Sequence, residues 1–176
     1  MAAIERAANA QEPQVVILLG SKSDMEHRAA ITRGLDRFAV THETRIASAH
    51  KVTRYLLDLL DRYEQDGRPL VYITVAGRSN ALSGVVDANS RHPVIACPPY
   101  GERFAGMDLL SSVRMPGGVA PMLVLEPEGA ALAAAKILAM GDPALAQRIA
   151  AWQNELREQA MADDRDAQNT PNRDPS

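Results

Sequence analysis

Three short polar segments carry the residues of this chain that could bind or transform a small molecule. They are residues 20–24 (GSKSD), 48–51 (SAHK) and 77–80 (GRSN), and each follows an apolar run. Hydroxyls and backbone N–H groups at the start of a helix bind anions such as phosphate. The carboxylate of Asp24 can accept hydrogen bonds from ribose hydroxyls. These residue types therefore indicate a site for a phosphorylated sugar compound.

His50 is the residue best suited to move a proton. An imidazole with its unperturbed pKa of about 6.5 takes up and releases protons near neutral pH. A lone histidine is more often structural, but His50 follows a predicted strand and belongs to no helical apolar stripe. His27, His42 and His92 fall at helix, strand and turn positions and are interpreted as structural.

The remaining chemical signals are weaker. Segment 20–24 lacks the four-residue spacer of a phosphate-binding Walker loop, so a plain strand-to-helix turn with a cap is its alternative interpretation. Arg78 is expected at a buried strand exit, where a guanidinium needs a carboxylate or an anionic ligand; whether it contacts a ligand or braces a loop stays open. Cys97 has no activating neighbour and is interpreted as a core residue. No His, Cys, Asp or Glu cluster has metal-ligand spacing.

The elements between these segments predict an α/β fold. Five apolar runs alternate with segments of helical periodicity, which favours a three-layer α/β/α domain with a five-stranded, parallel, doubly wound sheet of flavodoxin-like order. In such a sheet all strands end at one edge, so the three polar segments should converge there. The predicted strands are 15–19, 40–47, 70–75, 93–97 and 122–125, and the main helices are 25–38, 53–67, 80–89 and 127–140.

The length of 176 residues fits one domain with terminal extensions. An extra C-terminal helix has an apolar stripe from Leu145 to Leu156 with no further strand to cover. We expect it to dock on a neighbouring subunit, with packing on its own domain as the alternative. The predicted parts are a flexible leader (1–13), the main domain (14–140), the C-terminal helix (141–161) and a disordered tail (162–176).

Composition argues against several classes of protein. The formal net charge of −3 disfavours a nucleic-acid binder that works through bulk electrostatics. No run approaches the ~18 apolar residues of a membrane span, and the first residues lack the apolar core of a secretory signal. The expectation is a cytoplasmic protein with neither a nucleic-acid nor a membrane partner.

Read together, the three segments resemble the aminoimidazole ribonucleotide (AIR) carboxylases of purine biosynthesis, the PurE family. The third segment extends the likeness through residues 76–84 (AGRSNALSG). Residues 96–99 (ACPP), 111–118 (SSVRMPGG) and 125–128 (LEPE) add to it in the same order. The resemblance covers roughly Val15 to Met140.

The resemblance also points to a class within the family. Class I, the N-carboxyaminoimidazole ribonucleotide mutases, usually has AGGAAH after the third strand, whereas this chain has AGRSN, as class II does. Residues 97–99 (CPP), and Lys51 in place of arginine, agree with class II. The resemblance thus implies reversible carboxylation of AIR with carbon dioxide to 4-carboxy-AIR (CAIR), in de novo synthesis of the purine nucleotide IMP.

What the resemblance implies for individual residues is equally specific. His50 would be the proton shuttle. The resemblance also implies a homo-oligomer, tetramer or octamer, with active sites at subunit contacts. It implies a reaction that needs no metal, biotin or ATP. The residues it places around the ribose phosphate are Ser21, Asp24, Ser48 and Lys51, and those bordering the ligand or the carbon dioxide pocket are Gly77, Arg78, Ser79 and Leu82.

Two alternatives remain at this level. The first is the class I mutase. The second is a non-catalytic flavodoxin-like module that binds a ligand such as a flavin, which the fold alone does not exclude. Aromatic residues make up only 4% of the chain and are scarce at the predicted strand exits, where a flavin ring would stack.

Overall fold

The computed structural model describes residues 14–99 and 105–169. Its centre is a five-stranded sheet in the order β2-β1-β3-β4-β5, and every neighbouring pair of strands is parallel. This is the flavodoxin-like order predicted from the sequence. The strands are β1 (Gln14–Leu19), β2 (Thr41–Ile46), β3 (Leu70–Val75), β4 (Val94–Ala96) and β5 (Met122–Leu123).

The strands β1 and β3 are buried along their whole length, which explains their predominantly apolar sequences. β1 reads QVVILL and β3 reads LVYITV, and all twelve positions are buried. β2 lies at the edge of the sheet and reads THETRI, with partly exposed side chains. Parallel strands covered on both faces require this apolar composition, whereas an edge strand does not.

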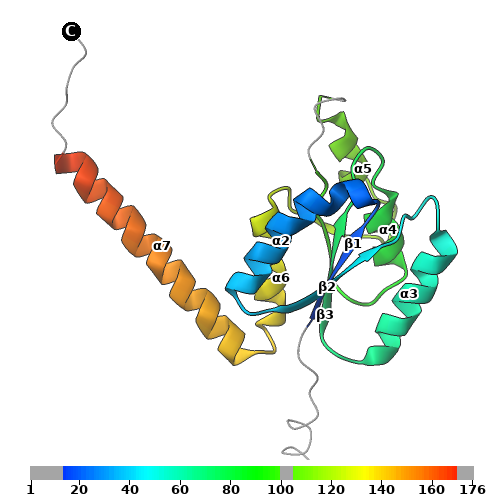
Figure 1. Cartoon of the computed structure of the whole chain (residues 1–176), viewed down its shortest axis with the longest axis horizontal. Helices are drawn as coiled ribbons and strands as arrows, with labels where there is room; N and C mark the ends of the chain where they lie inside the picture. Colours follow the sequence, from blue (N-terminus) through cyan, green and yellow to red (C-terminus); the bar gives the residue numbers. More distant parts are fainter. Residues whose placement is uncertain (1–13, 100–104, 170–176) are drawn as a thin grey trace, which may run out of the picture.

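Helices cover both faces of the sheet (Figure 1). Because side chains alternate along β1, Val15 and Ile17 belong to the core under α2 and α6, while Val16 and Leu18 belong to the core under α3 and α4. Gly34 of α2 lets α2 and α6 approach closely, since a Cβ built there would lie 2.6 Å from Cβ of Ala131 in α6. The covering helices are α2 (Met25–Arg37), α3 (Thr53–Asp66), α4 (Ala81–Ala88) and α6 (Pro127–Leu138).

Four shorter or peripheral elements complete the described part of the chain. The short helix η1 directly precedes α2, and η3 runs directly into α5. No helix within residues 14–99 and 105–169 combines the length and the apolar character needed to cross a membrane. The elements are η1 (Lys22–Asp24), η3 (Met107–Leu109), α5 (Leu110–Val113) and the C-terminal helix α7 (Pro143–Asn169).

The first turns of α7 pack on their own domain. Leu145 and Ile149 are buried, and the ring of Trp152 meets that of Phe38 edge-on with centroids 5.3 Å apart. The Nε of Arg148 donates to the carbonyl oxygen of Phe38 at 2.8 Å. Towards its C-terminal end α7 extends away from the body of the domain (Figure 1). Own-domain packing thus applies to the first turns, and docking of the remainder on another subunit stays a prediction.

The helix also runs further than its apolar pattern indicated. Residues 162–169, predicted as part of a disordered tail, continue α7 to Asn169. Side chains four residues apart support this stretch: Gln159 donates to Asp163 at 2.7 Å and Gln168 to Asp164 at 2.8 Å. Such local pairs sustain an exposed helix that has no apolar face. The predicted leader (1–13) and residues 170–176 lie outside the described residues.

Candidate functional site

A cavity of about 480 Å³ lies where β1, β2 and β3 end. The three polar segments singled out in the sequence meet there, as expected for the carboxyl edge of a parallel sheet. All nine residues predicted for the site line this cavity, together with Gly20, Ser23, Ala49 and Ala76. The nine are Ser21, Asp24, Ser48, His50, Lys51, Gly77, Arg78, Ser79 and Leu82. Their individual roles stay predictions.

The first segment is a self-contained turn. The backbone N–H of Ser21 donates to Oδ2 of Asp24 at 2.8 Å, and the Ser21 hydroxyl donates to the same oxygen at 3.2 Å. Ser21 in turn accepts from the backbone N–H of Ser23 at 3.2 Å. Asp24, the residue before α2, makes no cap hydrogen bond to that helix, because its carboxylate accepts from Ser21 instead. The turn presents hydroxyls and one carboxylate to the cavity.

His50 lies in the turn between β2 and α3, and its side chain is exposed at the cavity. This turn is fixed by the start of α3: the N–H of Val52 donates to the Ser48 carbonyl at 3.0 Å. Thr53 is the first residue of α3, and its hydroxyl donates to the Ala49 carbonyl. The imidazole of His50 is therefore accessible to a ligand in the cavity.

The third segment departs from the expectation in one respect. The Arg78 side chain is exposed rather than buried, so it needs no buried counter-charge. Its backbone is unusual, with φ at 61° in the left-handed region, which non-glycine residues rarely adopt. Asn80 caps α4 by accepting from the N–H of Ser83 at 3.1 Å. Leu82, which is buried, closes the cavity from below with an apolar surface.

The loop also approaches its neighbours closely through a glycine. A Cβ built on Gly77 would lie 3.3 Å from Cγ of Pro99, which follows β4. A side chain at position 77 would therefore push the loop away from the residues after β4. Glycine at position 77 thus allows the loop to lie close to the segment after β4.

Sequence reasoning missed a contact beside the cavity. His27, on the first turn of α2, places Nε2 3.4 Å from Sγ of Cys97, and this sulfur lies 3.6 Å from the Leu125 carbonyl oxygen. Burial raises the pKa of the Cys97 thiol to about 12, and burial also lowers the pKa of His27. Both groups are therefore neutral near pH 7, and Cys97 is the core residue predicted from the sequence.

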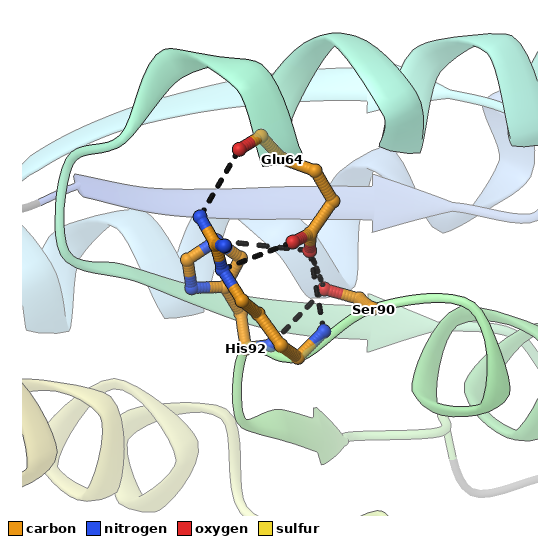
Figure 2. Close-up of polar contacts among 4 residues, drawn as sticks. Glu64, Ser90 and His92 are labelled. Carbon is orange, nitrogen blue, oxygen red and sulfur yellow. Dashed lines mark hydrogen bonds and ion pairs between the residues drawn. The ribbon is translucent and has the colours of Figure 1, made fainter.

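A second cluster lies at the opposite, amino-terminal edge of the sheet (Figure 2). Oε1 of Glu64 accepts from the Ser90 hydroxyl at 2.5 Å, and Oε2 lies 3.1 Å from Nε of Arg91. Nε2 of His92 lies 3.7 Å from Oε1 of Glu64. The imidazole ring of His92 packs edge-on against the ring of Tyr72. These contacts join the end of α3 to the loop before β4, so His92 is structural, as is His42 paired with Asp36 at 2.9 Å.

Within the described ranges, no group of three or more His, Cys, Asp or Glu side chains could hold a metal ion. What the cavity offers is hydroxyls, one carboxylate, an imidazole, two cationic side chains and an apolar base. Those groups suit an anionic, hydroxylated ligand. Volume agrees as well, since small-molecule sites usually measure about 300–1,000 Å³.

Several known proteins similar to this chain are named as enzymes that act on a ligand of this kind, phosphoribosylaminoimidazole. A phosphoribosylaminoimidazole carboxylase from Archaeoglobus fulgidus is 50% identical over 152 residues, covering 86% of this chain and 83% of the relative. One from Treponema denticola is 45% identical over 152 residues and covers 86% and 96% of the two chains. The crystal structure of Treponema denticola PurE superposes with a TM-score of 0.86 at 44% identity, covering 88% of this chain and 98% of that one.

The family model described as AIR carboxylase matches residues 14–159, which include every predicted site residue and the first turns of α7. This agrees with the resemblance found in the three polar segments. The chain belongs to the AIR carboxylase family.

Proposed function

We propose that this chain is a class II AIR carboxylase, which joins AIR and carbon dioxide to form CAIR in purine biosynthesis, with His50 as the proton shuttle. The observation that carries the proposal is the single cavity that brings together Asp24, His50 and Arg78 from three segments far apart in the sequence. Membership of the AIR carboxylase family supplies the substrate.

The proposed chemistry needs few groups from the protein. The nucleophilic ring carbon of AIR forms a bond to the carbon of carbon dioxide, and the electron pair of one C=O bond moves to oxygen to give a carboxylate. The same ring carbon still carries its hydrogen, and His50 removes it as a proton so that the ring recovers its aromatic system. In decarboxylation His50 returns that proton to the ring carbon. Holding the two reactants together and transferring one proton are the tasks of the site.

The other residues of the cavity are proposed to bind the substrate and the carbon dioxide. Ser21, Asp24, Ser48 and Lys51 contribute hydroxyls, a carboxylate and a cation, which suits the ribose and phosphate of the substrate. The rest of the predicted lining is assigned to the ring and the carbon dioxide, namely Gly77, Arg78, Ser79 and Leu82. Among residues 14–99 and 105–169, no Phe, Tyr or Trp side chain lines this cavity, which gives a stacked flavin ring no partner from the described part of the chain.

One assay separates class II from the class I mutase. Purified protein is given AIR and bicarbonate, without ATP and without the synthetase that makes N-carboxy-AIR, and CAIR is followed by its ultraviolet absorbance. Turnover under these conditions supports class II, and the segment AGRSN at residues 76–80 is the sequence feature behind that expectation. Turnover of N-carboxy-AIR alone would reassign the chain to class I. Failure with both substrates would reject the enzyme.

We also propose a homo-oligomer, a tetramer or an octamer, that works in the cytoplasm. Large apolar side chains are exposed around η3, α5 and β5, a surface that association would cover. They are Met107, Leu110, Val113, Met122 and Leu125. Light scattering of the purified protein tests the assembly, and a monomer at micromolar concentration would overturn it.

A further inference from the structure

The loop that carries Arg78 and Ser79 is tied to a segment about thirty residues further along the chain. The backbone N–H of Asn80 donates to the hydroxyl of Ser111 at 2.9 Å, and that hydroxyl donates to the Asp108 carbonyl at 2.7 Å. The backbone N–H of Arg78 donates to Oδ2 of Asp108 at 3.4 Å. The segment from η3 into α5 therefore meets the backbone of the loop at two points.

A third contact is buried. Nδ2 of Asn80 donates to the hydroxyl of Ser112 at 2.9 Å, and both residues are 2% exposed. The orientation of this amide is set by its other end, because Oδ1 of Asn80 accepts from the N–H of Ser83 to cap α4. One side chain thus joins the start of α4, the end of the loop and α5. Loss of the Ser112 oxygen would leave a buried donor without a partner, which folded proteins avoid.

The loop needs such support because its conformation is strained. Arg78 has φ at 61°, and a non-glycine residue keeps a left-handed backbone only where its surroundings hold it there. Ser79, Arg78 and Gly77 line the cavity, whereas Asn80, Ser111 and Ser112 do not. The hydrogen-bonding residues therefore act on the cavity through the loop.

We propose that Ser111 and Ser112 are positioning residues, which hold loop 77–80 in the conformation that lets Arg78 and Ser79 face the substrate. This inference rests on the proposed function for its substrate, AIR, but the hydrogen bonds that carry it belong to the protein alone. When either serine loses its hydroxyl, the loop samples other conformations. The apparent affinity for substrate then falls by the fraction of molecules that keep the competent one.

The test uses the full chain with Ser111→Ala and Ser112→Ala. If the competent fraction falls to one tenth, KM for AIR rises about tenfold while kcat stays within about twofold. Hydrogen exchange is measured on the same samples without ligand. The amides of Asn80 and Ser83 should exchange at least about tenfold faster than in the parent chain, with the strand β1 unchanged.

Two further variants separate positioning from general stability. Ser111→Thr keeps a hydroxyl at a half-buried site and should restore KM. Ser90→Ala removes a comparable serine hydrogen bond, to Glu64 at the far edge of the sheet. It should lower the melting temperature as Ser111→Ala does, but leave KM for AIR and exchange at Asn80 unchanged.

The outcomes are distinguishable. Unchanged KM and unchanged exchange in both alanine variants would overturn the inference, as would an equal rise in KM for Ser90→Ala. If the parent chain does not carboxylate AIR at all, the proposed function fails instead. The exchange rates at Asn80 and Ser83 then decide the inference by themselves.

Discussion

The imidazole of His27 and the thiol of Cys97 are in contact, with Nε2 and Sγ 3.4 Å apart, although seventy residues separate them in the chain. His27 follows the turn that contains Ser21 and Asp24, and Cys97 follows β4. The contact therefore links one wall of the cavity to the strand end beside it. Burial keeps both partners uncharged near neutral pH, so this pair lacks the thiolate and imidazolium of a cysteine nucleophile.

Cys97 should accordingly be inert in the folded protein. It is fully buried and burial raises the pKa of its thiol to about 12, so almost no thiolate exists at pH 8 and a reagent has no access. We expect no reaction with a disulfide reagent over an hour at pH 8, followed by complete reaction in denaturing urea. Rapid labelling of the native protein would contradict the buried position.

His50→Asn should remove turnover while substrate still binds. Without a proton-transfer group, carboxylation and decarboxylation should both fall by about 10²- to 10⁴-fold. AIR binding, followed by calorimetry, should change little, because the cavity keeps its hydroxyls and cations. His42→Asn is the matched control, since His42 lies on β2 away from the cavity and pairs with Asp36. Near-normal activity of His50→Asn would reject its role as the proton shuttle.

The cluster around His92 predicts how stability depends on pH. Burial lowers the pKa of His92 in the folded state, and the nearby Glu64 carboxylate opposes this only in part. The unfolded chain therefore binds a proton at a higher pH than the folded chain does. Stability should be constant above the unfolded value near pH 6.5 and fall as the pH drops below it, by at most about 1.4 kcal/mol per pH unit for this proton.

Urea unfolding from about pH 7.5 down to about pH 5 measures this slope. His92→Gln cannot take up the proton, so its stability should fall less steeply over that interval than that of the parent chain. His27→Gln should reduce the slope further, because burial lowers the pKa of His27 too. Identical slopes in the parent chain and His92→Gln would show that the His92 proton is not linked to folding.

Gly34→Ala should destabilise the domain in spite of the better helix propensity of alanine. The new Cβ would lie 2.6 Å from Cβ of Ala131, so α2 and α6 must move apart. Overpacking of this kind costs about 1–3 kcal/mol, which exceeds the roughly 1 kcal/mol that alanine gains over glycine in a helix.

A double-mutant cycle checks the cause. Ala131→Gly removes the opposing methyl group, so the pair Gly34→Ala/Ala131→Gly should recover part of the loss measured by urea unfolding. Gly117→Ala is the control, because a Cβ there would meet no atom within 4 Å. Additive effects of the two substitutions would show that the helices do not touch at this point.

The sequence pattern predicted the architecture well, because strands and helices of this kind are marked by short, local runs of apolar and polar residues. The fully buried strands β1 and β3 read as apolar runs, and the polar segments follow them directly. Once the sheet is parallel, its strand ends must share an edge, so the meeting of Asp24, His50 and Arg78 at one cavity follows from topology. Two local predictions were wrong. The Arg78 side chain is exposed rather than buried, and α7 continues to Asn169 because side-chain pairs four residues apart support a helix that has no apolar stripe there.

The amino-acid sequence by itself determined the α/β class, the order of elements and the residue types available at the strand ends, since these depend on periodicity and on short motifs. Only the tertiary structure decided which distant groups meet: His27 with Cys97, Glu64 with Ser90 and His92, and Asn80 with Ser111 and Ser112. The physical reason is that a hydrogen bond depends on positions within a few tenths of an ångström. Those positions are set by the packing of whole helices on the sheet, which no local stretch of sequence specifies.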